Sequence, residues 1–246
     1  MRVDILTLFP DLFTGFLKET ILGRAIQKGL LDIRLTNIRS FAQGPHKTVD
    51  DKPYGGGDGM VLKPGPVWRA LQSIERIGEK SCAILLTPQG KTFNQSLAWE
   101  LSRKEHLILI CGHYEGVDER IRADGIDGEL SIGDYVLSGG ELAAMVVVEV
   151  VGRLVPNVLG GRRSNLEDSF EEGLLEYPHY TRPKVFRNQE VPEVLLSGNH
   201  ESIRIWRRTE SLRRTLERRP DLLAKAKLTE EDRRILARLQ VETGSE

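Results

Sequence analysis

The chain has 246 residues, of which 39% are hydrophobic and 29% are charged, and its net charge is −1. These values are typical of a globular protein with one large domain or two smaller ones. The longest apolar run, at residues 142–148, is far too short to cross a membrane. The chain opens on a strand-like segment rather than a basic and then apolar leader, and we therefore expect a cytoplasmic protein with no membrane partner.

The N-terminal part of the chain alternates between strand-like and helix-like segments. Apolar residues at helical spacing predict helices at residues 10–29, 67–78 and 95–105. Short apolar or alternating runs predict strands at residues 3–8, 31–38, 82–87 and 107–111. Such alternation is typical of a parallel sheet with helices on both faces. Between these elements, residues 40–66 are rich in Gly, Pro and Asp and predict a long irregular segment, which is usually functional or mobile.

Three glycine-bearing segments follow strands of the predicted sheet, at residues 85–91, 110–116 and 130–141. Ligands of parallel sheets bind beyond the carboxyl ends of the strands, where these segments would meet. Each single glycine is explained as well by a plain turn, but three such segments together favour a ligand site. Ser138 and Glu141 have the spacing of a capping box, which predicts that a helix begins there.

The character of the chain changes after residue 160. Residues 161–176 predict a linker with a short helix at 170–175, followed by an arginine-rich helix at 203–219 and a last helix capped at Thr229. Residues 177–246 contain 15 Lys and Arg against 11 Asp and Glu, while residues 1–176 contain 20 against 25. This asymmetry fits a polyanionic partner, although solvated helix faces explain it equally well.

Several common site motifs are absent from the sequence. It has no G-x-G-x-x-G after the first strand, no P-loop, no nucleophile elbow and no paired metal-ligand spacing. Cys82 and Cys111 each lie in a strand-like run, and we interpret them as buried thiols rather than a disulfide or metal ligands.

Six motifs distributed along the chain carry a resemblance to a known family. They are LTPQGK (86–91), CGHYEGVDER (111–120), SIGDYVLSGGE (131–141), EDSF (167–170), PHYTRP (178–183) and VLLSGNH (194–200). Together with LTLFP (6–10) and DDKPYGGGDGM (50–60), they resemble the motifs of bacterial tRNA (guanine-N1)-methyltransferases of the SPOUT class. The resemblance runs essentially from end to end.

The resemblance implies an α/β fold with a parallel sheet, helices on both faces and a deep C-terminal trefoil knot, followed by a small all-α domain. Pattern alone would not predict the knot, because true knots are rare. The implied domains are a cofactor-binding methyltransferase domain at residues 1–160, a linker at 161–176 and a helical tRNA-binding domain at 177–246.

The knot of such proteins holds S-adenosylmethionine in a bent pose. The residues that match the family's cofactor-binding loops are Leu86, Thr87, Pro88, Gln89, Gly112, Tyr114, Glu115, Gly116, Ile132, Gly133, Tyr135, Leu137, Gly139 and Gly140. Tyr135 and Leu137 are equally compatible with plain core positions. Members of the family are also said to depend on Mg²⁺, but no local ligand set in this sequence shows a metal site.

Two residues match the family's catalytic groups. Asp168 corresponds to the general base that takes the N1 proton of guanine, although its local pattern also fits a helix cap. Arg153 corresponds to the cation that would stabilise charge on the guanine carbonyl, although a solvated charge at a helix end is the simpler explanation.

The family acts on tRNA, at the anticodon stem-loop, as a homodimer with an active site built from both chains. The residues implied in tRNA binding are Asp50, Ser164, Glu176, His179, Arg182, Asn199, Arg207 and Arg214. Position 176 departs from the family, which often has Asp there. Residues 42–66 and 160–176 are plausible lids over the site.

The leading hypothesis is transfer of a methyl group from S-adenosylmethionine to N1 of guanosine at position 37 of tRNA, next to the anticodon. One alternative is a SPOUT methyltransferase that modifies a different RNA base or a ribose. Another is a non-catalytic RNA-binding protein that uses its basic helix alone, and the complete set of cofactor loops argues against it.

Overall fold

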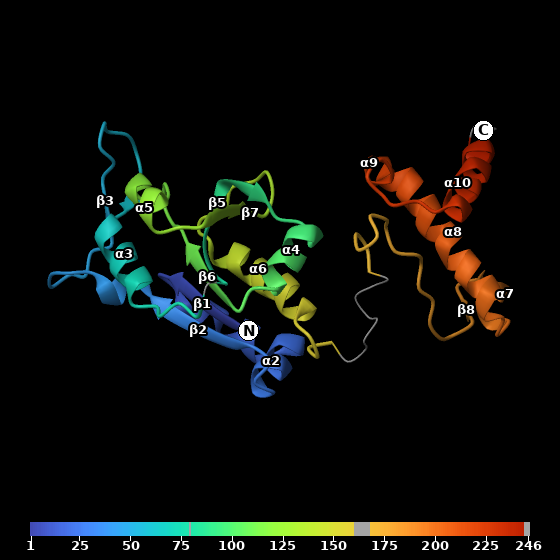
Figure 1. The fold of residues 1–246 in the computed structure, drawn as a ribbon, viewed down its shortest axis with the longest axis horizontal. Coiled ribbons are helices and arrows are strands. Elements are labelled where there is room, and N and C mark those ends of the chain that lie inside the picture. Colours follow the sequence, from blue (N-terminus) through green and yellow to red (C-terminus); the bar gives the residue numbers. More distant parts are fainter. Residues whose placement is uncertain (79, 160–167, 244–246) are drawn as a thin grey trace. The chain divides into compact units, whose positions relative to one another are not determined.

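The computed structural model describes residues 1–78, 80–159 and 168–243 (Figure 1). The chain divides into two compact units, residues 1–161 and residues 162–246. Each unit has a core of its own. In the described residues, no helix combines the length and the apolar character that spanning a bilayer would require.

The N-terminal unit is built on a five-stranded parallel sheet with the strand order β2-β1-β6-β5-β7. Its strands are β1 (Arg2–Thr7), β2 (Asp32–Asn37), β5 (Ser81–Thr92), β6 (His106–Cys111) and β7 (Gly128–Ser131). Because all five run in the same direction, their carboxyl ends lie along one edge. The predicted parallel sheet is confirmed.

Helices cover both faces of this sheet, as the sequence predicts (Figure 1). They are α2 (Thr20–Gln27), α4 (Gln95–Ser102) and α6 (Glu141–Leu154) on one face, and α3 (Pro64–Gln72) and α5 (Glu119–Asp124) on the other. In β6, Leu107 and Leu109 pack in the first cluster while Ile108 and Ile110 pack in the second. The side chains of a strand point alternately to its two faces, so a run of apolar residues serves both cores.

The predicted helix at residues 10–29 is wrong as a single element. Thr20 has a left-handed φ of 62°, which interrupts the helix. The segment therefore consists of η1 (Pro10–Phe13), α1 (Thr14–Lys18) and α2, and Gly29 at φ 68° ends it as expected.

The segment at residues 40–66 is more ordered than its composition predicts. It contains the end of η2 (Ile38–Phe41), the short antiparallel pair β3 (Asp50–Asp51) and β4 (Val61–Leu62), and the first turn of α3. The N–H of Glu115 donates to the carbonyl of Met60 at 2.9 Å, and the N–H of Leu62 donates to the carbonyl of Gly116 at 2.9 Å. These backbone bonds fasten β4 to the loop after β6.

Helix α6 begins at Glu141, with Gly140 as its N-cap residue, so the predicted capping box at Ser138 is wrong. The carboxylate of Glu141 instead turns toward β1, where the hydroxyl of Thr7 donates to its Oε1 at 2.7 Å. Both side chains are buried. This bond ties the start of α6 to the carboxyl end of β1.

The C-terminal unit is a small helical unit around the buried residues Leu174, Leu212, Leu236 and Leu239. Its elements are β8 (Val185–Phe186), β9 (Gln189–Glu190), α7 (Glu193–Leu196), α8 (His200–Arg218), α9 (Pro220–Leu223) and α10 (Glu230–Thr243).

Two local predictions for this unit have opposite outcomes. The predicted helix at residues 170–175 is wrong, because Phe170 (φ 77°) and Gly173 (φ 79°) adopt left-handed conformations. The predicted cap of the last helix is confirmed: the N–H of Asp232 donates to the hydroxyl of Thr229 at 3.1 Å, and the N–H of Thr229 donates to the Asp232 carboxylate at 2.8 Å.

Asp232 also holds α10 against α8 through an ion pair with Arg208 at 2.6 Å. The carboxylate is 1% exposed. The hydrogen bonds from Arg208 lower the pKa of Asp232 from 3.8 to about 2. A carboxyl group whose pKa is lower in the folded state than in the unfolded state stabilises the fold at pH values above its unfolded-state pKa. This contribution is lost as the pH falls toward 2.

We therefore expect Asp232→Asn to lower the free energy of unfolding of this unit by about 2 kcal/mol at pH 7, and by about half as much at pH 3. A urea titration followed through the methyl NMR signals of Leu212, which reports on this unit alone, measures both values. Glu230→Gln, which removes an exposed ion pair with Arg233, is the control and should change the stability by less than about 0.5 kcal/mol. An equal loss at both pH values would contradict this role of Asp232.

Candidate active site

A pocket lies at the carboxyl ends of β6 and β7 and beside the irregular stretch of β5 between Leu86 and Lys91, where its register against β7 shifts. The three glycine-bearing segments meet there. Every residue that the sequence predicts for cofactor binding lines this pocket. Further lining residues, which the prediction did not include, are Leu85, His113, Val117, Arg122, Leu130, Ser131, Val136, Ser138 and Ala143. The fold thus brings together side chains from positions 85 to 143, at the edge where parallel sheets hold their ligands.

The close approach of two loops forms the floor of the pocket. The N–H of Gly140 donates to the carbonyl of Gly112 at 2.8 Å, and His113 and Gly139 form an isolated antiparallel bridge. A Cβ atom on Gly140 would lie 2.8 Å from the Cα of Cys111, a contact that real side chains do not make. Glycine at position 140 is therefore required for the two loops to touch.

Two tyrosines on these loops are open to solvent. Tyr114 is 43% exposed and has a left-handed φ of 61°, while Tyr135 is 54% exposed and donates its hydroxyl to the carbonyl of Ile132 at 3.2 Å. A left-handed conformation is strained for a bulky side chain and is found mostly at functional sites. The exposure of Tyr135 excludes the alternative that it is a plain core residue.

Arg122 is the pocket residue that sequence reasoning missed most clearly. Its guanidinium donates to Oε1 of Gln89, and it forms ion pairs with Glu119 and Glu129, each at 3.2 Å. Because Arg122 belongs to α5, these contacts hold the loop after Leu86 against that helix. No local motif marks Arg122, whereas His113 lies inside the CGHYEG motif and could have been found there.

The predicted catalytic residues lie outside this pocket. Arg153 is half-buried in the last turn of α6, and twelve residues separate it from Glu141. At 1.5 Å per residue, it lies about 18 Å along the helix from the pocket end of α6. Asp168 belongs to the C-terminal unit, where it lines a second hollow together with Glu176, Tyr177 and Arg207.

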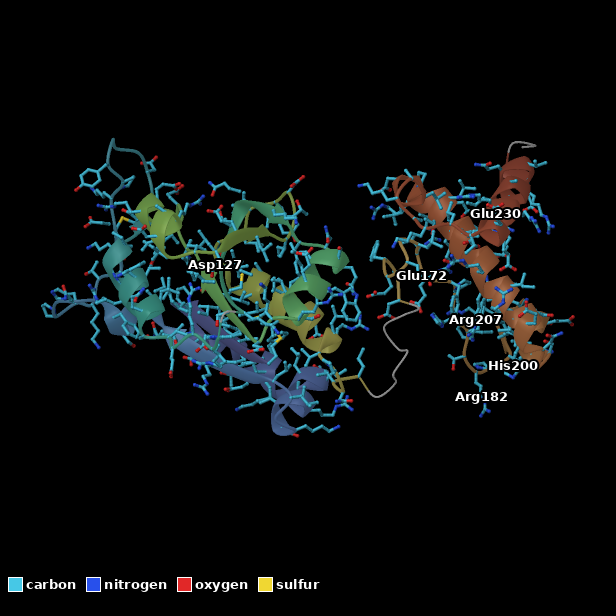
Figure 2. The ribbon with its side chains drawn as sticks, in the orientation of Figure 1. Asp127, Glu172, Arg182, His200, Arg207 and Glu230 are labelled. Atoms are coloured by element: carbon cyan, nitrogen blue, oxygen red, sulfur yellow. The ribbon has the colours of Figure 1, made fainter. Side chains whose placement is uncertain are left out.

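The predicted tRNA-binding residues lie mainly on the C-terminal unit. Figure 2 shows His200 and Arg207 projecting from α8 and Arg182 from the segment before β8. The ring of His179 is hydrogen-bonded to the carboxylate of Glu176 at 2.7 Å. The Arg207 guanidinium lies 4.8 Å from the ring centre of Tyr177.

The other predicted tRNA-binding residues lie in different structural environments. Asn199 caps α8 by accepting from the N–H of Ser202 at 3.1 Å. Arg214 is half-buried on α8, and Asp50 lies in β3 of the N-terminal unit. Ser164 falls outside the described residues.

The arginines of α8 and of its C-cap position, Arg219, fall into two groups. Four of them form ion pairs within the unit: Arg204 with Glu231, Arg208 with Asp232, Arg213 with Glu242 and Arg219 with Asp221. Among residues 168–243, the other three, Arg207, Arg214 and Arg218, have no ion-pair partner. They are seven and four residues apart and so lie on one face of the helix. The ion pairs of the first group act within the unit, so these four arginines need no polyanionic partner.

No metal centre emerges from the described part of the chain. There, no three His, Cys, Asp or Glu side chains gather where they could hold an ion. Both cysteines are free, and burial raises the pKa of the Cys111 thiol well above its ordinary value.

The fold and the pocket define an α/β protein with a glycine-lined pocket at the edge of its parallel sheet, followed by an arginine-rich helical unit. Residues 1–225 match the family model described as tRNA (guanine-1)-methyltransferase TrmD. The chain belongs to this family.

Curated relatives cover nearly the whole chain. It is 56% identical over 246 residues to the tRNA (guanine-N(1)-)-methyltransferase of Moorella thermoacetica, covering 99% of this chain and 98% of the relative. It is 58% identical over 243 residues to the enzyme of the same name from Brevibacillus brevis, covering 98% and 99%. A relative from Dictyoglomus turgidum, also of that name, is 54% identical over 246 residues, covering 100% and 99%.

The contact between Gly140 and Cys111 gives a direct prediction. Gly140→Ala should weaken S-adenosylmethionine binding at least about tenfold, because the added methyl group forces the two loops apart at a cost of about 1–3 kcal/mol. Isothermal titration calorimetry measures the affinity, and circular dichroism checks the fold. Gly128→Ala is the matched control, since a Cβ there meets nothing within 4 Å. Equal affinity in the two variants would contradict the role of the close approach.

Proposed function

We propose that this protein transfers a methyl group from S-adenosylmethionine to N1 of guanosine at position 37 of tRNA. The observation that carries the proposal is the single pocket into which the fold gathers all of the predicted cofactor loops. Membership of the tRNA (guanine-1)-methyltransferase family supports both the reaction and the substrate.

The pocket fits the proposed methyl donor. Glycines at 112, 139 and 140 allow backbone to come close to a flat adenine ring, and exposed Tyr114 and Tyr135 supply aromatic surface. When bound, S-adenosylmethionine supplies an electrophilic methyl group on its sulfonium. The contribution of the protein is then to hold N1 of guanine in line with that methyl group, and positioning of this kind supplies most of the rate gain.

Asp168 is the proposed general base. N1 of guanine carries a proton at neutral pH, so its lone pair becomes available only when a base takes that proton. A carboxylate suits this step because it accepts hydrogen bonds and needs no change of charge beforehand. The helix-cap alternative for Asp168 loses its basis, because no helix follows it in residues 168–175.

The positions of Arg153 and Asp168 favour an active site shared between two chains. Arg153 lies at the far end of α6 from the pocket of its own chain. The exposed face of α6 carries Leu142 (57% exposed) and Val146 (41% exposed), one turn apart. Such apolar exposure on one helix face is typical of a protein interface. In the proposed homodimer, the partner supplies Arg153 to stabilise the negative charge on the guanine carbonyl.

The C-terminal unit is the proposed tRNA-binding unit. One face of α8 carries three arginines that have no ion-pair partner among the described residues, namely Arg207, Arg214 and Arg218. Phosphates are the natural partners of such arginines. The proposed target is the anticodon stem-loop, and the protein would act in the cytoplasm. We assign no step to Mg²⁺, because no described cluster of ligands fits it.

The alternative hypotheses predict different products. A SPOUT enzyme of another specificity would methylate a different base or a ribose, and a non-catalytic RNA-binding protein would transfer nothing. Incubation with a labelled methyl donor and unmodified tRNA transcripts, followed by nucleoside mapping, separates all three. The proposal requires 1-methylguanosine at position 37.

Asp168→Asn should retain S-adenosylmethionine binding and lose at least about 10²-fold in single-turnover methyl transfer, the usual contribution of a general base. Calorimetry and rapid-quench assays measure the two quantities. Glu171→Gln neutralises another carboxylate of the same turn and should keep the parent rate. Transfer by Asp168→Asn at close to the parent rate would show that another group is the base.

The shared active site predicts complementation between two impaired variants. Chains with Asp168→Asn and chains with Gly140→Ala are unfolded, refolded together and assayed well below the Kd for S-adenosylmethionine, where Gly140→Ala dimers contribute little. The mixture should then recover about a quarter of the parent activity, because half of the dimers are mixed and each has one intact site. Each variant refolded alone is the control. No recovery, with mixed dimers present by mass spectrometry, would show that a single chain builds the whole site.

A further inference from the structure

The hairpin β8–β9 presents an unusual surface for so short an element. Val185 is 48% exposed and Phe186 is 62% exposed. The hairpin has only two residue pairs, Val185 with Glu190 and Phe186 with Gln189. Two-stranded hairpins of this size are marginally stable in water by themselves. Large exposed apolar side chains on such an element indicate a surface that is covered when the protein works.

The charges around these apolar side chains indicate what covers them. Arg182, Lys184 and Arg187 are all exposed, and among the described residues none of them has an ion-pair partner. Glu190 is the one carboxylate within residues 179–190. A surface meant for another protein is usually depleted of lysine at its centre. A positive, aromatic surface instead complements a nucleic acid.

The turn of the hairpin aims one of these cations at the aromatic ring. Arg187 and Asn188 both have left-handed φ values, 51° and 62°, which is the geometry of a two-residue type I′ turn. The Arg187 guanidinium lies 5.5 Å from the ring centre of Phe186. The ring is thus covered by a flat cation and yet remains 62% exposed. This arrangement of a planar guanidinium beside an open ring is the kind on which nucleobases stack.

We infer that the hairpin is a docking site for the tRNA substrate, in which Phe186 stacks on an unpaired base while Lys184 and Arg187 contact the flanking phosphates. This inference rests on the proposed function and adds to it a base-stacking site outside α8. Stacking on an aromatic side chain tolerates any base, so the site contributes affinity and orientation rather than sequence choice.

The test compares binding of an unmodified tRNA transcript by the full-length parent and its variants. Phe186→Leu keeps an apolar side chain but removes the ring, and it should weaken tRNA binding about tenfold with an unchanged salt dependence. Phe186→Tyr keeps the ring and should restore the parent affinity. Lys184→Gln should instead reduce the slope of log K against log salt by about one. Fluorescence anisotropy at several salt concentrations measures each effect.

Controls separate this inference from the proposed function. Val241→Ala changes another exposed apolar residue of the same unit and should bind tRNA as the parent does. All variants should bind S-adenosylmethionine equally, and their circular dichroism spectra and thermal unfolding should match those of the parent, which shows that the C-terminal unit with its separate core is folded. Equal tRNA affinity of Phe186→Leu and the parent overturns the stacking site. A variant that changes its oligomeric state and not its RNA binding also overturns the stacking site. A parent that binds tRNA but yields no 1-methylguanosine overturns the proposed function and leaves the docking result standing.

Discussion

The active-site end of the molecule depends on one close contact between backbones. Gly140 meets the end of β6 so closely that any side chain at position 140 would collide with Cys111. The hydrogen bond from Gly140 to Gly112 then fixes the distance between the loop after β6 and the loop before α6. The bond between Thr7 and Glu141 also holds the start of α6, from the end of the neighbouring strand β1. The pocket between these loops exists because both constraints act at the same end of one helix.

The same geometry is the basis of the proposed shared active site. Helix α6 starts at the pocket and carries Arg153 away from it, and its exposed apolar residues support the proposed homodimer. In the C-terminal unit, three arginines of α8 form ion pairs with α10, namely Arg204, Arg208 and Arg213. The arginines of α8 without an ion-pair partner among the described residues share one face. The proposed tRNA contact would use this face, while the ion-paired arginines stabilise the unit.

The sequence predicts regular elements well where periodicity decides them. The strands β1, β2, β5 and β6, the helices α3 and α4 and the cap at Thr229 follow from local patterns. The predictions are wrong where tertiary contacts or left-handed backbone conformations determine the local structure. Thr20 breaks the first helix, Phe170 and Gly173 prevent another, and Thr7 captures the carboxylate of Glu141 that the capping box needed. The sequence does not reveal Arg122 as a pocket residue, because only the folded chain brings α5 next to the loop after Leu86. The trefoil knot remains a prediction, since alternation of strands and helices does not encode threading.

The central claim is that the three glycine-bearing loops hold the methyl donor. Hydrogen exchange with and without saturating S-adenosylmethionine tests it most directly, because backbone amides report on each loop separately. The account predicts slower exchange at residues 86–91, 112–117 and 131–141, and unchanged exchange in α8 and α10. Protection that appears elsewhere and spares these three loops would contradict it.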